Sequence, residues 1–106
     1  MPETEHSSGD LRVVDVPAAS RFELMLGDQR VGLADYSVVG DVMTVPHVET
    51  DPAHQGQGFA AILMGGVIDS LRANGQTLVP VCPYAAAYMR RHPETRDLLA
   101  EQTGRS

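Results

Sequence analysis

The chain has 106 residues, of which 42% are hydrophobic, and its formal net charge is −6. This length fits about one domain, and the chain contains no apolar run long enough to span a membrane. Eight basic residues against fourteen acidic ones argue against nucleic acid as the main partner, because such binding depends on Lys and Arg neutralising phosphates. A cationic partner, such as an amine or a lysine-bearing protein, fits the charge better.

The N-terminus and the cysteine content indicate the compartment. No basic segment followed by an apolar one opens the chain, so we expect no signal peptide. Cys82 is the one cysteine, which excludes an intramolecular disulfide. These features predict a soluble protein of the cytoplasm. Residues 1–9 are small and polar and are predicted to be a disordered tail, and residues 10–102 to form a single domain.

The first half of the chain is rich in β-forming residues. Gly27-Asp28 and Gly40-Asp41 are hairpin turn signals between these segments. Pro46 has no N–H to donate to a ladder, which predicts a bulge or a splayed point there. The tight turns predict an antiparallel meander of the segments 21–26, 30–39 and 42–49, with 11–16 as a further strand before them.

The second half predicts a helix, a strand and two further helices. Apolar residues at helical spacing begin at Phe59, and Asn74-Gly75 ends that helix. The glycine pair at 65 and 66, in the middle of the helix, suggests close packing on a sheet; the alternative is that the pair has no packing role. Strand 77–81 then returns parallel to strand 42–49 through a right-handed crossover. Pro83 and Pro93 open helices predicted at 83–91 and 93–100.

The overall pattern therefore predicts an α/β fold of the α+β type. It consists of a mixed sheet, in which an antiparallel meander leads into a β-α-β crossover with splayed parallel strands, followed by C-terminal helices.

Two glycines, Gly56 and Gly58, stand just before the predicted helix. A helix N-terminus has unpaired N–H groups and a partial positive charge, and glycines let a ligand approach the backbone, so this pattern suits a phosphate. The alternative is that both glycines only shape a tight loop. The pattern is neither a dinucleotide fingerprint, since a third glycine is missing, nor a P-loop, since no Gly-Lys-Ser/Thr follows.

The stretch QGQGFA is similar to the Q/R-x-x-G-x-G/A signature of GNAT-type N-acetyltransferases. With "HVETDPAHQGQGFAAILM" and "LVPVCPYAAAYMRRHPE", residues 20–99 resemble the minimal single-domain branch of that family, which lacks the helices that usually help to build the acceptor site. The resemblance implies that a set of loop residues binds the pyrophosphate of acetyl-coenzyme A, namely Gln55, Gly56, Gln57, Gly58, Phe59 and Ala60.

The predicted parallel strands end at one crevice, where ligands bind in such folds. A free backbone N–H near Val48 and Thr50, on the splayed strand, is suited to polarise a thioester carbonyl, as the resemblance also implies. His47 and Glu49 share one face of the strand and are both candidates for the base that deprotonates an amine. Histidine is suited to this task without special tuning, whereas a glutamate requires burial to serve as that base.

Three residues after the last strand complete the candidate site. Cys82 precedes a helix N-terminus, where a thiolate is favoured, and it matches a cysteine of the minimal GNAT branch; the alternative is a small core residue. Tyr88 resembles the GNAT tyrosine that protonates the departing coenzyme sulfur, although an ordinary packing role is equally open. Tyr84, one helical turn earlier, is expected to line the pantetheine groove.

Several other polar residues carry weaker expectations. His54 neighbours the glycine loop and is expected to be a solvated histidine rather than a phosphate ligand. His92 carries no prediction. No close Cys/His pair supports a metal site. The arginines are expected to be solvated, with one of them meeting the 3′-phosphate of the coenzyme: Arg72, Arg90 or Arg91.

The sequence therefore predicts an acyltransferase that uses acetyl-CoA to acetylate a primary amine, either a protein lysine or a small amine. The alternatives are a non-catalytic module that binds coenzyme A or acyl-CoA, and a structural domain without any coenzyme. The sequence does not predict an oligomeric state.

Overall fold

The computed structural model describes residues 11–54 and 56–100, so the predicted tail at 1–9 lies outside the described residues. The strands are β1 (Leu11–Val16), β2 (Arg21–Leu26), β3 (Gln29–Val39), β4 (Val42–Thr50) and β5 (Thr77–Pro80). The helices are α1 (Phe59–Asn74), α2 (Pro83–Arg91) and the short 3₁₀ helices η1 (Pro17–Ala19), η2 (Pro52–His54) and η3 (Pro93–Leu98).

The strands form one five-stranded sheet in the order β1-β2-β3-β4-β5. Neighbours are antiparallel up to β4, and β5 is parallel to β4. Gly27 and Gly40 both have φ near 60° and turn the β2–β3 and β3–β4 hairpins, a conformation that costs glycine nothing. The predicted meander, its parallel crossover and the fold class are confirmed.

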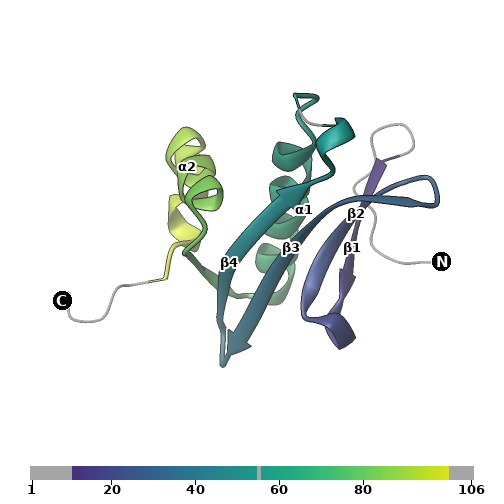
Figure 1. Ribbon diagram of the computed structural model, residues 1–106. Helices are drawn as coiled ribbons and strands as arrows, with labels where there is room; N and C mark the ends of the chain where they lie inside the picture. The colour runs from purple at the N-terminus through teal and green to yellow at the C-terminus, as the bar shows by residue number, and fades with distance from the viewer. Residues whose placement is uncertain (1–10, 55, 101–106) are drawn as a thin grey trace.

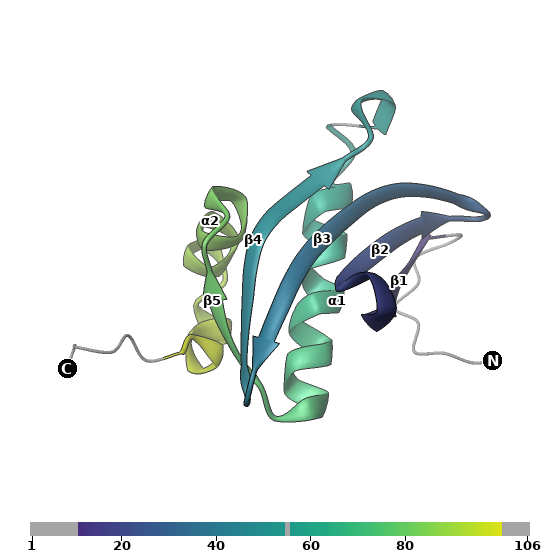
Figure 2. The same cartoon turned by 60° about the horizontal axis from the view of Figure 1, so that its bottom comes forward.

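The α-helices α1 and α2 cover the same face of the sheet (Figures 1 and 2). The fully buried side chains of the sheet, such as Phe22, Leu24 and Val45, pack toward this side, where α1 contributes Leu63 and Leu71. No helix of the described residues covers the opposite face, which we call the open face. The core is therefore one-sided, and the open face remains accessible.

The glycine pair of α1 is explained in part by packing. A Cβ on Gly66 would lie 2.6 Å from the Val13 side chain, so only glycine lets α1 approach β1 this closely. A Cβ on Gly65 would meet only the Tyr88 hydroxyl, at 3.9 Å. The close packing expected of both residues is therefore found at Gly66 alone.

Strand β4 contains an irregularity where the sequence places Pro46. Asp35 pairs with His47 and Ser37 with Thr44, so β4 has one residue more than β3 between these pairs and forms a bulge. The parallel ladder with β5 also ends here, at the Val45–Pro80 pair. Beyond this point β4 and β5 separate, which confirms the predicted bulge and splay.

The last predicted elements differ from the structure in two respects. Strand β5 ends at Pro80, and its only buried residue is Leu78. The final helix is a 3₁₀ helix ending at Leu98, because its backbone hydrogen bonds run between residues three apart, as from Thr95 to His92. The chain then joins the sheet edge, where the Ala100 N–H donates to the Leu78 carbonyl at 2.9 Å.

Candidate active site

The glycine loop lies between η2 and α1. Gly56 and Gly58 have φ values of 85° and 78°, a left-handed conformation that other residues adopt only under strain. A Cβ at either position would meet nothing within 4 Å, so the space in front of the loop is open. The glycines are thus required by the backbone, as the simpler alternative held, and they also leave the loop accessible to a ligand.

The N-terminus of α1 is suited to bind an anion. Gly58 is its N-cap, no side chain caps it, and its first turn contains no acidic residue. The first backbone hydrogen bond of the helix runs from the Ile62 N–H to the Gly58 carbonyl, at 3.2 Å. The N–H groups of the preceding turn, including those of Phe59 and Ala60, have no partner inside the helix. Gln57 is exposed beside them, and Gln55 lies outside the described residues.

His54 was expected to be solvated, and this expectation is wrong. Its side chain is only 20% exposed, and its ring stacks on Phe59 with centroids 5.5 Å apart. Its Nδ1 is buried without a hydrogen bond and lies 3.7 Å from the Asp51 carboxylate. The loop folds His54 onto the start of α1, because Asp51 accepts hydrogen bonds from the backbone of Ala53 and His54 and so forms a tight turn.

The free edge of β4 presents backbone donors beside this loop. The Glu49 carbonyl and the Asp51 N–H both point toward β3. Since the backbone groups of successive strand residues point to opposite edges, those of Val48 and Thr50 point away from β3, where β5 has separated. The two positions predicted to hold a carbonyl through the backbone are therefore the two that face the splay.

His47 and Glu49 lie on the open face, as their predicted common orientation requires. His47 Nε2 is 2.7 Å from Glu49 Oε1, and the two side chains are 52% and 58% exposed. Val48 points the other way and packs against the core. Glu49 lacks the burial that a base of neutral pH requires, so His47, supported by Glu49, is the better candidate base.

Cys82 joins the end of the parallel ladder to α2. Its N–H donates to the Val45 carbonyl at 3.0 Å, and its carbonyl accepts from Ala86 at 2.9 Å. It is a free, buried cysteine at the N-cap of α2. The sequence thus placed it correctly at a helix N-terminus beside the splay, and its burial also fits the alternative of a core residue.

Tyr84 and Tyr88 project from α2 on the helix-covered side of the sheet. Both are half-buried and pack against the core. Burial raises the pKa of both phenols, and the nearby Arg91 partly offsets this for Tyr84, whereas Tyr84, Glu94 and Asp69 raise the pKa of Tyr88 further. Tyr88 therefore retains its proton at neutral pH, as a proton donor must.

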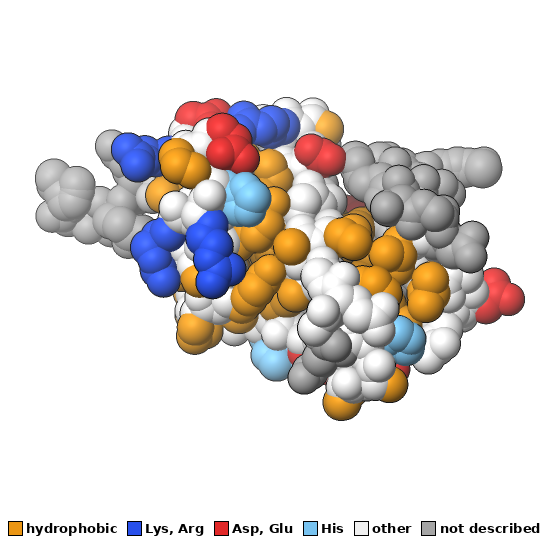
Figure 3. Space-filling model, turned by 90° about the horizontal axis from the view of Figure 1, so that it is seen from above, with side chains coloured by type: hydrophobic (Ala, Val, Ile, Leu, Met, Phe, Trp, Pro, Cys, Tyr) orange, Lys and Arg blue, Asp and Glu red, His pale blue; other side chains and the backbone are white. Residues whose placement is uncertain are grey.

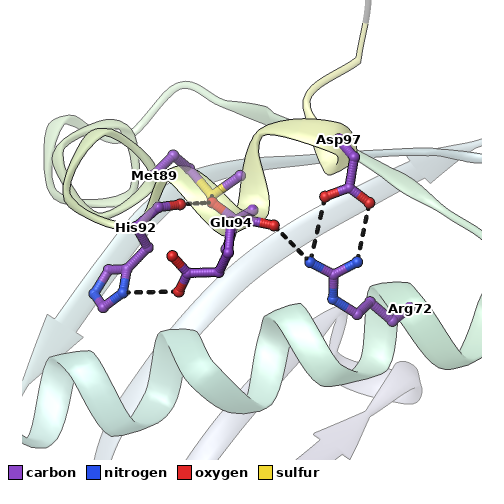
Figure 4. Close-up of polar contacts among 6 residues, drawn as sticks. Arg72, Met89, His92, Glu94 and Asp97 are labelled. Atoms are coloured by element: carbon purple, nitrogen blue, oxygen red, sulfur yellow. Dashed lines mark hydrogen bonds and ion pairs between the residues drawn. The ribbon is translucent and has the colours of Figure 1, made fainter.

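His92 and Arg72 make contacts that the sequence did not indicate. The His92 ring stacks on the Tyr88 ring with centroids 4.1 Å apart. Arg72, expected to be solvated or to meet a phosphate, instead binds the Asp97 carboxylate at 3.0 Å and the Glu94 carbonyl at 3.0 Å (Figure 4). The four-residue spacing of Tyr84, Tyr88 and His92 was the one signal that could have revealed the stack.

The end of the molecule that carries the glycine loop presents both hydrophobic and basic side chains. Seen from this end, the hydrophobic side chains gather in separate patches, and basic side chains lie on the α2 side (Figure 3). By contrast, the hollow between β1 and α1, about 250 Å³ and lined by Val13, Asp15 and Asn74 among others, contains none of the predicted site residues. In the described part of the chain, no three metal-binding side chains cluster together.

The candidate site thus spans both faces of the sheet. The glycine loop, Cys82, Tyr84 and Tyr88 lie on the side of the helices, whereas His47 and Glu49 lie on the open face. The two groups lie on opposite sides of the region in which β4 and β5 separate.

Comparison with known proteins identifies the family. The family described as "GCN5-related N-acetyl-transferase" matches residues 21–98, most of the chain. The chain therefore belongs to the GCN5-related N-acetyltransferase family, as the glycine loop had indicated. No match was found among curated proteins. No helix of the described residues is long and apolar enough to cross a membrane.

Solved structures with a similar fold are N-acetyltransferases. The ribosomal-protein-S18-alanine N-acetyltransferase of Escherichia coli is 26% identical over 67% of this chain, with a TM-score of 0.58, and the match spans 49% of that enzyme. A GCN5-like putative N-acetyltransferase of Staphylococcus aureus matches 92% of this chain and 96% of its own, at 16% identity and a TM-score of 0.62. The ribosomal-protein-alanine N-acetyltransferase of Brucella melitensis biovar Abortus 2308 matches 88% and 72%, at 17% identity and a TM-score of 0.56.

Proposed function

We propose that this protein uses acetyl-CoA to acetylate a primary amine carried by a protein. The observation that supports this most directly is the splay of β4 from β5 beside an uncapped helix N-terminus. Backbone donors at Val48 and Thr50 face the gap, and those of residues 56–60 surround an open space at the start of α1. A diphosphate and a thioester carbonyl both require such donors.

Each candidate residue has a distinct part in this proposal. The amides of the glycine loop bind the pyrophosphate, and Tyr84 lines the path of the pantetheine arm. The backbone N–H of Val48 or Thr50 polarises the thioester carbonyl. His47, supported by Glu49, accepts the amine proton, and Tyr88 protonates the departing sulfur. Cys82 borders the reacting centre.

The open face favours a protein acceptor over a small amine. His47 and Glu49 are exposed on a surface that no described helix covers, so a chain segment can reach them. Two structural neighbours are named for alanine acetylation of a ribosomal protein. An N-terminal α-amine is therefore proposed as an acceptor beside the ε-amine of a protein lysine.

A non-catalytic module that binds coenzyme A is the second candidate. The exposure of His47 and Glu49 favours it, because these residues lack the enclosed environment that usually tunes catalytic groups. Both candidates predict coenzyme binding, and only the enzyme predicts release of free thiol when an amine peptide is added.

The test uses two glycines that both have a positive φ, 78° at Gly58 and 60° at Gly40. Gly58→Ala and Gly40→Ala each place a Cβ on a residue with positive φ and open surroundings, so each should cost about 1–2 kcal/mol of stability. Only Gly58→Ala should weaken acetyl-CoA binding, measured by isothermal titration calorimetry.

Thermal melting of the wild type provides the complementary measurement. Acetyl-CoA at 100 times its dissociation constant should stabilise the protein by about 2.7 kcal/mol. The absence of any thermal shift would contradict both ligand-binding candidates. A shift without thiol release, with peptides carrying either an N-terminal amine or a lysine, would favour the binding module.

A further inference from the structure

A stripe of three aromatic rings runs along one side of α2 and ends at His92. Tyr84, Tyr88 and His92 are four residues apart, so they share one side of the helix. The Tyr88 and His92 rings are stacked, with centroids 4.1 Å and planes 25° apart. The Tyr88 hydroxyl lies beside α1, 3.9 Å from the place a Cβ on Gly65 would occupy. The stack and the helix together restrict the direction of that hydroxyl.

The backbone of His92 is held by a buried residue. Thr95 is 3% exposed, and its N–H and hydroxyl donate to the His92 carbonyl at 2.8 and 2.7 Å. On the other side of the residue, His92 Nδ1 lies 3.3 Å from the Glu94 carboxylate (Figure 4). Both the position and the tilt of the imidazole are therefore determined by the turn between α2 and η3.

The same turn is fixed to the end of α1 by one arginine. The Arg72 guanidinium donates to both Asp97 carboxylate oxygens, at 3.0 and 3.3 Å, and to the Glu94 carbonyl at 3.0 Å (Figure 4). These groups are exposed, and exposed ion pairs contribute little to stability. What the contact provides is geometry: the helix beside the Tyr88 hydroxyl and the turn that carries His92 keep a fixed spacing.

We propose that His92 is a positioning residue for acetyl transfer, because its ring holds the Tyr88 hydroxyl in the direction of the departing sulfur. Arg72 supports it by fixing the turn against α1. This inference rests on the proposed function, in which Tyr88 supplies the proton. It concerns the chemical step, so it predicts an effect on kcat rather than on coenzyme binding.

The test compares two substitutions of His92 in the full chain. His92→Ala removes the ring, and a proton donor displaced by about 1 Å can slow a reaction by about 100-fold, so we expect kcat to fall 10- to 100-fold with the KM for acetyl-CoA unchanged. His92→Phe restores a stacked ring without a titrating group, and its kcat should return close to the wild-type value. Arg96→Ala, on the same turn, is the control and should leave both constants unchanged.

Each outcome has a distinct meaning. An active wild type with an equally active His92→Ala overturns this inference and leaves the proposed function standing. Equal losses in His92→Ala and His92→Phe overturn stacking as the cause. A wild type that transfers no acetyl group overturns the proposed function and the inference together. Should His92→Ala fail to fold by circular dichroism, the folded Arg72→Met variant replaces it, and an unchanged kcat there overturns the inference.

Discussion

Cys82 is the residue whose part in the chemistry is most sharply testable. Its sulfur lies in the core at the end of the parallel ladder, and the chain has no lysine, because all eight of its basic residues are arginine. An acetyl group that appears on the protein therefore cannot be on a lysine side chain. The choice between direct attack by the amine and an acetyl-cysteine intermediate is thus accessible to intact mass spectrometry.

We expect direct attack, because the thiol is buried and makes no hydrogen bond with another described side chain. Incubation with acetyl-CoA alone should add no acetyl group that neutral hydroxylamine removes. Cys82→Ala should lower kcat by about tenfold, a change of about 1.4 kcal/mol in the barrier, without weakening acetyl-CoA binding. A hydroxylamine-sensitive acetyl group present in the wild type and missing in Cys82→Ala would show the covalent route instead.

Tyr36 predicts how stability depends on alkaline pH. Burial raises the pKa of its phenol well above the usual range, and the Asp15 carboxylate, which accepts a 2.6 Å hydrogen bond from the hydroxyl, raises it further. The folded chain therefore keeps a proton that the unfolded chain loses above about pH 10. The contribution of Tyr36 to stability is complete below that pH and is lost as the pH rises through the pKa of the folded state.

Urea unfolding at about pH 8 and about pH 11 measures this loss. Tyr36→Phe removes the phenol and keeps the ring that packs on Phe22 at 5.1 Å, so its stability should decline less between the two pH values. Tyr84→Phe is the comparison, because the pKa of Tyr84 is raised by burial without a carboxylate partner. Equal pH dependence in the wild type and Tyr36→Phe would show that another group is responsible.

At the scale of the element, the approach of α1 to β1 depends on one glycine. Gly66→Ala should lower the free energy of unfolding by about 1–3 kcal/mol, because its Cβ would overlap the branched Val13 side chain. Gly65→Ala, one residue earlier, would meet only the Tyr88 hydroxyl at an ordinary contact distance of 3.9 Å, so it should instead raise the free energy of unfolding by up to about 1 kcal/mol through helix propensity. Urea denaturation of the two variants measures the difference.

A second substitution isolates the cause. Val13→Ala in the Gly66→Ala background removes the two overlapping methyl groups of Val13 and leaves its Cβ, which is also 2.6 Å away. It should therefore recover part of the stability, a coupling that a double-mutant cycle quantifies. Additive losses of stability from Gly66→Ala and Val13→Ala would mean that α1 and β1 are not in contact at these two residues.

At the scale of the whole molecule, the proposed function assigns coenzyme binding and amine deprotonation to different faces of the sheet. His47→Gln should lower kcat/KM for an amine peptide by about 100-fold, the effect expected on losing a general base, and should leave the dissociation constant for acetyl-CoA unchanged. Gly58→Ala should instead raise the dissociation constant for acetyl-CoA and leave kcat/KM for the amine peptide unchanged. Steady-state kinetics and calorimetry on both variants measure this, and weaker acetyl-CoA binding in His47→Gln would contradict the separation.

Local patterns predicted the strands, the helices and the splay. Turn glycines, alternating apolar residues and a proline without a donor act over a few residues, so the sequence shows them directly. The contact of Arg72 with Asp97 could not be predicted from local patterns, because the fold brings these two residues together across 25 positions. His54 was misjudged for the same reason, since its burial depends on the loop folding back onto Phe59.

The parting of β4 from β5 leaves the start of α1 on one side of the sheet and His47 on the other. In the proposed function, a donor that binds on the side of the helices therefore does not obstruct an acceptor that binds on the open face. Neither reactant needs to come first, and neither product must wait for the other to leave, so initial-rate and product-inhibition patterns should show a ternary complex assembled in random order.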